Sequence, residues 1–279
     1  MPTFRTAPTD NARVGRERFR VTGLLGEGAA GVVYRAIDGA SEVALKVLRG
    51  SDVELQRRFA REARLASACR SRHVVAILEV GDDYLVMPLY RGGSLGARLA
   101  REGPLSPLEL VDAAAQLAAG LDALHARDVL HRDVKPSNVL IDDRGQLVLT
   151  DFGLARGADS TQLTREGQLV GSLHYLAPEL IEGAPASRAS DIYSLGCLLY
   201  ECAVGAPPFA GRSDAELVYA QLAETPADPC ERRPELPPDL GRALLSALAK
   251  HPRSRPTTAT ALARMLHLAG TPAPAGSAA

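Results

Sequence analysis

The chain has 279 residues, of which 46% are apolar and 23% are charged, and its formal net charge is −1. These values suit one enzyme domain of two lobes or two small domains, and they argue against a nucleic-acid or anionic-membrane binder. Residues 1–18 contain no apolar signal region, and no run of eighteen apolar residues exists. Four cysteines without metal-ligand spacing favour a reduced, cytoplasmic setting.

The first part of the chain is predicted to be rich in strands. Short apolar and β-branched runs are separated by turns that contain glycine and aspartate. Ser51 and Glu54 have the spacing of a capping box, which predicts that a helix begins there. The expected strands are Phe19–Leu25, Val32–Ile37, Val43–Leu48, Val74–Val80 and Tyr84–Leu89, and the expected helix spans residues 52–69.

Helices are predicted to dominate after residue 90. Ser106, Pro107 and Glu109 combine an N-cap, a first-turn proline and a capping-box carboxylate. The helix that they open has one apolar face, because Leu110, Ala114, Leu117, Leu121 and Leu124 recur at spacings of four and three. Further helices are expected at Ser190–Val204, Asp214–Ala223, Leu240–Ala249 and Thr258–Leu268.

This order of elements indicates an α+β fold with two lobes. Proline and paired glycines at Pro88–Gly93 interrupt both patterns, so we place the joint between the lobes there. A cleft between lobes is a favoured ligand site. The expected organisation is a flexible segment at 1–18, one domain at 19–269 with lobes at 19–88 and 92–269, and a disordered tail at 270–279.

A short hairpin is predicted between two polar motifs. Val139–Ile141 and Leu147–Leu149 flank a turn that contains glycine, as in a hairpin. Such a hairpin would bring Asn138 and Asp151, at its outer ends, close together. Amide and carboxylate oxygens side by side suit Mg²⁺.

Two further polar residues, Asp133 and Lys135, lie just upstream of Asn138. A base, a cation and a metal ion close together are the groups that a phosphoryl-transfer site requires.

These residues form the motifs His131-Arg132-Asp133-x-Lys135-Pro136-x-Asn138 and Asp151-Phe152-Gly153. Both are complete, and they resemble the catalytic loop and the D-F-G triplet of the protein kinase family. The resemblance covers nearly the whole chain and implies the protein kinase fold, with a small β-rich N-lobe and a larger helical C-lobe. Lys135 followed by Pro136 resembles serine/threonine kinases, and the arginine-rich composition favours a bacterial, eukaryotic-type (Hanks-type) member.

The resemblance also implies a reaction and its residues. The γ-phosphate of ATP would pass to Ser or Thr hydroxyls of proteins. The chain would also phosphorylate itself, in a transient dimer. Asp133 would accept the proton of the substrate hydroxyl, and Lys135 would steady the transferred phosphoryl group. Asn138 and Asp151 would hold Mg²⁺.

The glycine-rich stretch Gly26–Val33 has the pattern G-x-G-x-x-G-x-V. In a dinucleotide-binding loop this pattern opens a helix, whereas here strand-forming residues follow. A flap that closes over the phosphates of ATP is therefore favoured. The expected nucleotide-binding residues are Leu25, Gly26, Glu27, Gly28, Ala29, Ala30, Gly31, Val32, Val33, Ala44, Lys46, Glu62, Pro88 and Tyr90.

Lys46 is one of only three lysines among 32 basic residues, and it lies in a motif of the family. It could merely keep an edge strand soluble, but the resemblance implies that it holds the α- and β-phosphates. Glu62 lies on the apolar stripe of the first helix, and a carboxylate there needs a partner. We expect Glu62 to pair with Lys46, with Glu54 as the alternative.

The adenine is expected to meet the carbonyl of Pro88 and the backbone of Tyr90, next to Met87. Pro88 stands where relatives often have Glu, which affects the preference for inhibitors. His131 is expected to pack beneath Phe152 rather than to act as a base.

Control by phosphorylation is also expected. Arg132 precedes the catalytic aspartate and invites a phosphate from the following segment. Thr164 is the favoured phosphorylation site, and Thr161 is the second candidate. Glu166 could instead supply a permanent negative charge. The alternative is that both threonines are solvated loop residues without a regulatory role.

Three other residues are expected to be structural. Glu179 should pair with Arg255, and Asp191 should brace the catalytic loop. Ser172 should touch Asp133 and Lys135.

The motifs argue against two alternative functions. A pseudokinase would lack a strand lysine or a catalytic aspartate, and this chain has all of them. A small-molecule phosphotransferase of kinase-like fold usually lacks the segment Gly171–Glu179, which is present here. A sensor or membrane segment beyond Ala279 would make the chain a fragment of a receptor kinase.

Overall fold

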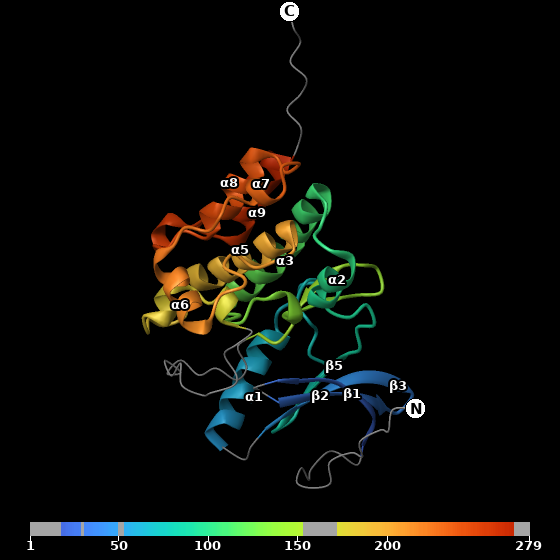
Figure 1. Cartoon of the computed structure of the whole chain (residues 1–279). Coiled ribbons are helices and arrows are strands. Elements are labelled where there is room, and N and C mark those ends of the chain that lie inside the picture. The colour runs from blue at the N-terminus through green and yellow to red at the C-terminus, as the bar shows by residue number, and fades with distance from the viewer. Residues whose placement is uncertain (1–17, 29–30, 50–52, 153–171, 271–279) are drawn as a thin grey trace, which may run out of the picture.

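The computed structural model describes residues 18–28, 31–49, 53–152 and 172–270. Figure 1 shows a lobe of strands packed against a lobe of helices, with α1 (Val53–Ser67) beside the sheet. The sheet is antiparallel in the order β1-β2-β3-β5-β4. Its strands are β1 (Phe19–Gly28), β2 (Gly31–Asp38), β3 (Ser41–Leu48), β4 (Glu79–Val80) and β5 (Tyr84–Pro88).

The centre of the sheet is β3, which pairs with β2 on one side and with β5 on the other. The tight turn before β3 requires Gly39, which has a positive φ of 61°. Residues Val43–Leu48 are all buried, because β3 is an inner strand with both neighbours present. Lys46 is therefore held in register, opposite Val33 and Leu85.

The prediction of a strand over Val74–Val80 is wrong for most of its length. Only Glu79–Val80 pairs within the sheet, as β4. The apolar residues at its start bond to the other lobe instead: the Val75 N–H donates to the Leu149 carbonyl at 2.8 Å, and Val74 forms a parallel bridge to Leu149. The apolar residues at the start of the predicted strand therefore connect the two lobes instead of extending the sheet.

The helical lobe is built around α3 and α5. The core cluster draws on α2, α3, α5, α8 and α9, and all five apolar residues predicted along α3 are fully buried. The described helices and strands of this lobe are α2 (Leu95–Glu102), α3 (Pro107–His125), β6 (Val139–Ile141), β7 (Leu147–Leu149), α4 (Pro178–Ile181), α5 (Arg188–Val204), α6 (Asp214–Ala223), α7 (Pro229–Arg232), α8 (Pro238–Ala247) and α9 (Ala259–Gly270).

The predicted start of α3 is confirmed. Ser106 accepts a hydrogen bond from the Glu109 N–H, and the Glu109 carboxylate accepts one from the Ser106 N–H at 2.9 Å. The predicted α6 has the expected bounds, and the other long helices differ by one or two residues at their ends. The short helices α2, α4 and α7 were not predicted, since a helix of one or two turns carries too little periodicity.

The joint between the lobes packs against the catalytic hairpin. A Cβ on Gly92 would lie 2.5 Å from the Ile141 carbonyl oxygen, and the Ile141 N–H donates to the Gly93 carbonyl at 2.9 Å. Glycine is thus needed where the connection crosses β6. None of the described helices is long and apolar enough to cross a membrane.

Candidate active site

The hairpin of β6 and β7 brings Asn138 and Asp151 together, as predicted. Val139 pairs with Leu149, and the Thr150 N–H donates to the Asn138 carbonyl at 2.9 Å. Asp151 follows directly and has a positive φ of 58°. An aspartate in this region is uncommon, so the surrounding contacts must hold it there.

Asn138 is buried, and its side chain is fixed by Asp133. The amide Nδ2 donates to the Asp133 carbonyl at 2.8 Å and to the Asp133 carboxylate at 2.9 Å. Both N–H groups of the amide are used in these bonds, so the amide oxygen remains as a ligand for a cation. Together with the Asp151 carboxylate this donor set consists of hard oxygens and fits Mg²⁺.

Three polar side chains meet next to Asn138. The Lys135 Nζ lies 2.9 Å from the Asp133 carboxylate and donates to Ser172 Oγ at 2.8 Å. The Ser172 hydroxyl in turn donates to Asp133 at 3.2 Å. The contacts expected for Ser172 are therefore confirmed, and the candidate base lies between a cation and a hydroxyl group.

Lys46 connects the strand lobe to this centre. Its side chain is 5% exposed, and its Nζ lies 2.7 Å from Asp151 Oδ1. A buried ammonium needs an anion as its partner, and Asp151 meets that need here.

The ion pair expected between Lys46 and Glu62 is not formed between these described residues. Glu62 Oε1 lies 2.9 Å from Arg132 Nη1 instead, in a partly exposed pair. The physical reason is competition, because two cations and two carboxylates meet at the lobe boundary and can pair in either combination. The sequence located all four groups but not which ones pair.

The catalytic loop is braced from below by Asp191, as predicted. Its carboxylate accepts hydrogen bonds from the backbone N–H groups of His131 and Arg132, both at 2.8 Å, and from His125 Nε2 at 2.8 Å. Arg132 has a positive φ of 63°, so the loop is strained where these bonds hold it.

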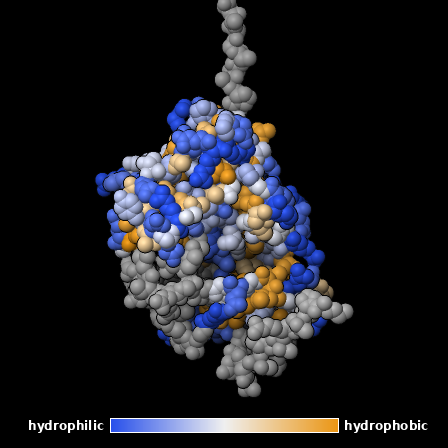
Figure 2. All heavy atoms as spheres, in the orientation of Figure 1, coloured by the Kyte–Doolittle hydropathy of each residue, from blue (hydrophilic) through white to orange (hydrophobic). Residues whose placement is uncertain are grey.

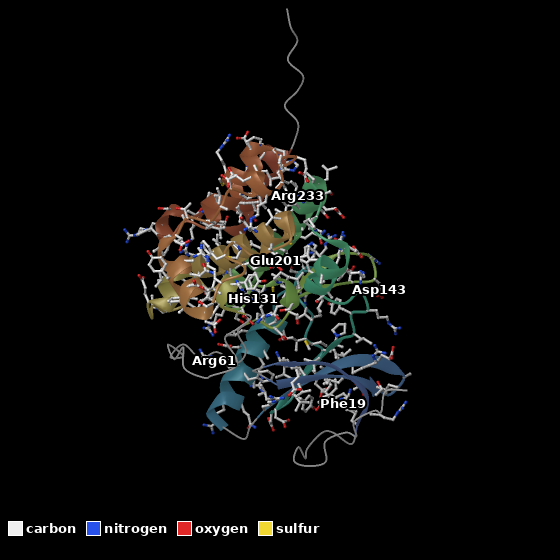
Figure 3. All side chains as sticks on the ribbon, viewed as in Figure 1. Phe19, Arg61, His131, Asp143, Glu201 and Arg233 are labelled. Atoms are coloured by element: carbon white, nitrogen blue, oxygen red, sulfur yellow. The ribbon has the colours of Figure 1, made fainter. Side chains whose placement is uncertain are left out.

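His131 packs against Phe152, with ring centroids 6.2 Å apart. Complete burial lowers the pKa of His131, so its ring is neutral at pH 7. Figure 3 shows His131 on the side of the helical lobe that faces the sheet. The expected packing role is confirmed.

The glycine-rich stretch is followed by a strand, as predicted: β2 begins at Gly31, and Gly31 pairs with Gly28 of the antiparallel β1. A Cβ on Gly31 would lie 2.0 Å from the Val47 carbonyl oxygen, so only glycine fits there. Gly26 and Gly28 face open space, as a flap over a ligand needs. Ala29 and Ala30 lie outside the described residues.

Four residues expected near the adenine form one apolar surface. Ala44 and Met87 are buried, and the partly buried Val33 and Tyr90 pack against the same cluster. Figure 2 shows a hollow between the two lobes, with apolar side chains on the side of the strand lobe. The residues at this surface fit a flat apolar ring with phosphates towards Lys46.

The other expected nucleotide-binding residues lie on β1, β2 and β5. Leu25 is 43% exposed on β1, and Pro88 ends β5 opposite Val43. Glu27 forms an exposed ion pair with Arg49, and Val32 pairs with Val47 within the sheet.

Several expectations fall outside the described residues: the capping box at Ser51 and the candidate switch residues Thr161, Thr164 and Glu166. The side chain of Glu54 is not described either. The pairing of Glu179 with Arg255 is confirmed, with two contacts of 2.7 Å.

Gln221, on α6, was not singled out from the sequence. It is fully buried and bonds to the backbone that follows Ser172. A polar residue four positions after the buried Leu217 was the available signal, because it places an amide on the apolar face of a helix.

Comparison with known proteins identifies the class. The family model described as "Protein kinase domain" matches residues 19–266. The chain therefore belongs to the protein kinase family, and it is a domain that uses ATP and Mg²⁺.

Its curated relatives are bacterial serine/threonine kinases. The DNA damage-responsive serine/threonine-protein kinase RqkA of Deinococcus radiodurans is 39% identical, over 90% of this chain and 39% of the relative. PknE of Mycobacterium bovis is 37% identical, over 90% of this chain and 46% of the relative. PrkC of Bacillus subtilis is 37% identical, over 87% and 39%. The chain thus spans less than half the length of these relatives, and the domain is of the bacterial serine/threonine kinase type.

Proposed function

We propose that this domain transfers the γ-phosphoryl group of ATP to Ser or Thr hydroxyls of proteins, with Asp133 as the base. The observation that carries this proposal is the position of Ser172. Its hydroxyl donates to Asp133 and accepts from Lys135. A substrate hydroxyl brought to Asp133 would meet the same carboxylate and the same ammonium group.

Each residue of the site has a role in this proposal. Asp133 orients the acceptor hydroxyl and takes its proton as the new bond forms. Lys135 offsets negative charge that develops on the transferred group. Mg²⁺ bound with ATP would neutralise the phosphates, and Asn138 and Asp151 are the residues that would hold it. Lys46 would bind the α- and β-phosphates from the strand lobe.

The pairing of Glu62 with Arg132 supports a second step. For Glu62 to reach Lys46 it must leave Arg132, and a phosphate can then take the place of the Glu62 carboxylate. A phosphate on Thr164 or Thr161 could serve in this way, since it carries about −1.5 to −2 charge at neutral pH. Autophosphorylation in a transient dimer would supply it. Glu166 is the alternative permanent charge.

The proposed partners are proteins with accessible Ser or Thr residues. A cytoplasmic location fits a domain that uses ATP and whose four cysteines are unpaired. The activity, substrates and partners of the whole protein would depend also on parts that the relatives have beyond this domain.

The roles can be separated with two variants. The purified chain is incubated with γ-labelled ATP, Mg²⁺ and a generic basic protein, and binding of Mg-ATP is measured by calorimetry. Asp133→Asn should lower phosphate transfer by about 10²–10⁴-fold and leave Mg-ATP binding nearly intact. Asp151→Asn should weaken both.

Asp143→Asn is the matched control, since Asp143 is exposed at the tip of the same hairpin (Figure 3). It should behave as wild type. Near-normal transfer by either active-site variant would refute the assignment.

A further inference from the structure

The short turn after Ser172 is held from α6 by one buried side chain. Gln221 is 0% exposed, and its Nε2 donates to the carbonyls of Leu173 at 3.0 Å and His174 at 2.9 Å. Its Oε1 accepts from the Tyr193 hydroxyl. The amide nitrogen and the amide oxygen of Gln221 therefore both have hydrogen-bond partners. Figure 1 shows α6 at the edge of the helical lobe.

This turn adjoins the place where the acceptor hydroxyl must lie. Ser172 bonds to Asp133 and Lys135, and Leu173–Tyr175 follow it directly. When the hydroxyl of a substrate reaches Asp133, the next residue of that substrate must therefore lie against the turn. The two carbonyls that Gln221 holds set the orientation of the peptide planes there, and with it the shape offered to the substrate.

A second bond holds the other end of the turn. Ser194 Oγ donates to the Tyr175 carbonyl at 2.7 Å. Leu173 is buried against Phe209 and Leu217, so the turn is anchored by apolar contact as well. Among the described side chains, however, only the amide of Gln221 binds two successive carbonyls of this turn. An apolar residue could fill the same volume without making these bonds.

Lys250 holds Gln221 in place from behind. Its Nζ donates to the backbone carbonyls of Ala220 at 2.9 Å and Gln221 at 2.8 Å, in the last turn of α6, and lies 4.7 Å from the centre of the Phe209 ring. It is one of only three lysines among the 32 Lys and Arg residues of the chain, and the other two, Lys46 and Lys135, are in the active site. A compact ammonium group fits between two carbonyls and a ring better than a planar guanidinium.

We propose that Gln221 is a positioning residue that sets the selectivity of the kinase for the substrate residue next to the phosphorylated one, and that Lys250 supports it. This inference rests on the proposed function, because selectivity for a substrate residue has meaning only if proteins are phosphorylated. Gln221 acts through the Leu173 and His174 backbone and does not touch the reacting atoms.

The test uses the whole chain and a position-scanning library of Ser-containing peptides, with γ-labelled ATP. Gln221→Glu replaces the amide donors with oxygens that repel the two carbonyls. It should raise KM by about tenfold for peptides that carry the preferred residue next to the acceptor Ser, because the two hydrogen bonds that orient the turn are lost. The kcat and the preferences at other positions should change far less. Gln221→Met, which keeps the volume, should show the same pattern, and Lys250→Met should show it more weakly.

Two controls separate positioning from general loss of structure. Leu262→Ala removes a fully buried side chain of α9 far from the turn and should lower activity toward all peptides alike. Tyr219→Ala changes an exposed residue on α6 and should leave the selectivity as in wild type. Hydrogen exchange of the Tyr175 and Leu176 N–H groups, which close the turn, should become faster in Gln221→Glu than in either control.

The outcomes are distinguishable. A wild-type chain that phosphorylates no peptide and no protein refutes the proposed function itself. An active wild type whose selectivity is unchanged by Gln221→Glu and Gln221→Met, or is reduced equally at every position as in Leu262→Ala, refutes the positioning role alone. Unchanged hydrogen exchange in the turn refutes it as well.

Discussion

Breaking the ion pair between Glu179 and Arg255 should strongly destabilise the helical lobe. The Arg255 side chain is 0% exposed and that of Glu179 is 11% exposed, and the two form a bidentate contact. The guanidinium also donates to the carbonyls of Ala249, Ala189 and Lys250 at 2.8–2.9 Å. Glu179→Gln removes the anion and leaves a buried positive charge.

The size of the effect follows from this geometry. Removing one partner of a buried ion pair costs about 3–5 kcal/mol. Three carbonyls still accept from Arg255, so we expect the lower end, about 3 kcal/mol of the free energy of unfolding. For a chain of this size that corresponds to a decrease in Tm of about 6–12 °C.

Unfolding in urea and on heating is followed by circular dichroism at 222 nm, because the chain has no tryptophan. Glu182→Gln, on an exposed residue just after α4, is the control and should change the free energy by less than about 0.5 kcal/mol. Glu179→Gln combined with Arg255→Met removes the buried charge and should be less destabilised than Glu179→Gln alone. A loss below about 1 kcal/mol in Glu179→Gln would refute the reasoning, because the pair would then behave as a surface pair.

Three further predictions follow from the site and its surroundings. Lys46→Arg should lose phosphate transfer in the labelled-ATP assay, since a planar fork does not replace a compact ammonium, and Glu62→Gln should lose much of it; wild-type rates would contradict both. Mass spectrometry should find phosphate on Thr164 or Thr161 in the active chain but not in Asp133→Asn, and a fully active, unmodified enzyme would contradict this. Burial raises the pKa of Glu201, so the folded state holds this proton to higher pH than the unfolded state. Stability relative to Glu201→Gln should therefore be greatest below the usual pKa of a glutamate and decline as the pH rises through the raised value; a difference that is constant from acid to neutral pH, measured by urea unfolding, would contradict it.

Local patterns in the sequence determined much of the site. The hairpin that joins Asn138 to Asp151 depends on two apolar runs and a turn within a few residues. The start of α3 depends on Ser106 and Glu109 within one helical turn. Because these features are short-range, the residues that form them also contain the information needed to predict them.

The resemblance to protein kinases extended this to longer distances. It paired Glu179 with Arg255 and placed Asp191 beneath the catalytic loop, and both are found. No periodicity or capping rule connects residues so far apart in the chain, so these contacts could be expected only from a known fold.

Only the tertiary structure decided which partners meet at the lobe boundary. Glu62 pairs with Arg132 and Lys46 with Asp151, although the same four charges could pair otherwise. Val74 and Val75 have a strand-like sequence, yet they bond to Leu149 of the other lobe. The physical reason is that charge and hydrogen-bonding capacity are properties of single residues, whereas the choice of partner depends on distances that packing of the two lobes sets.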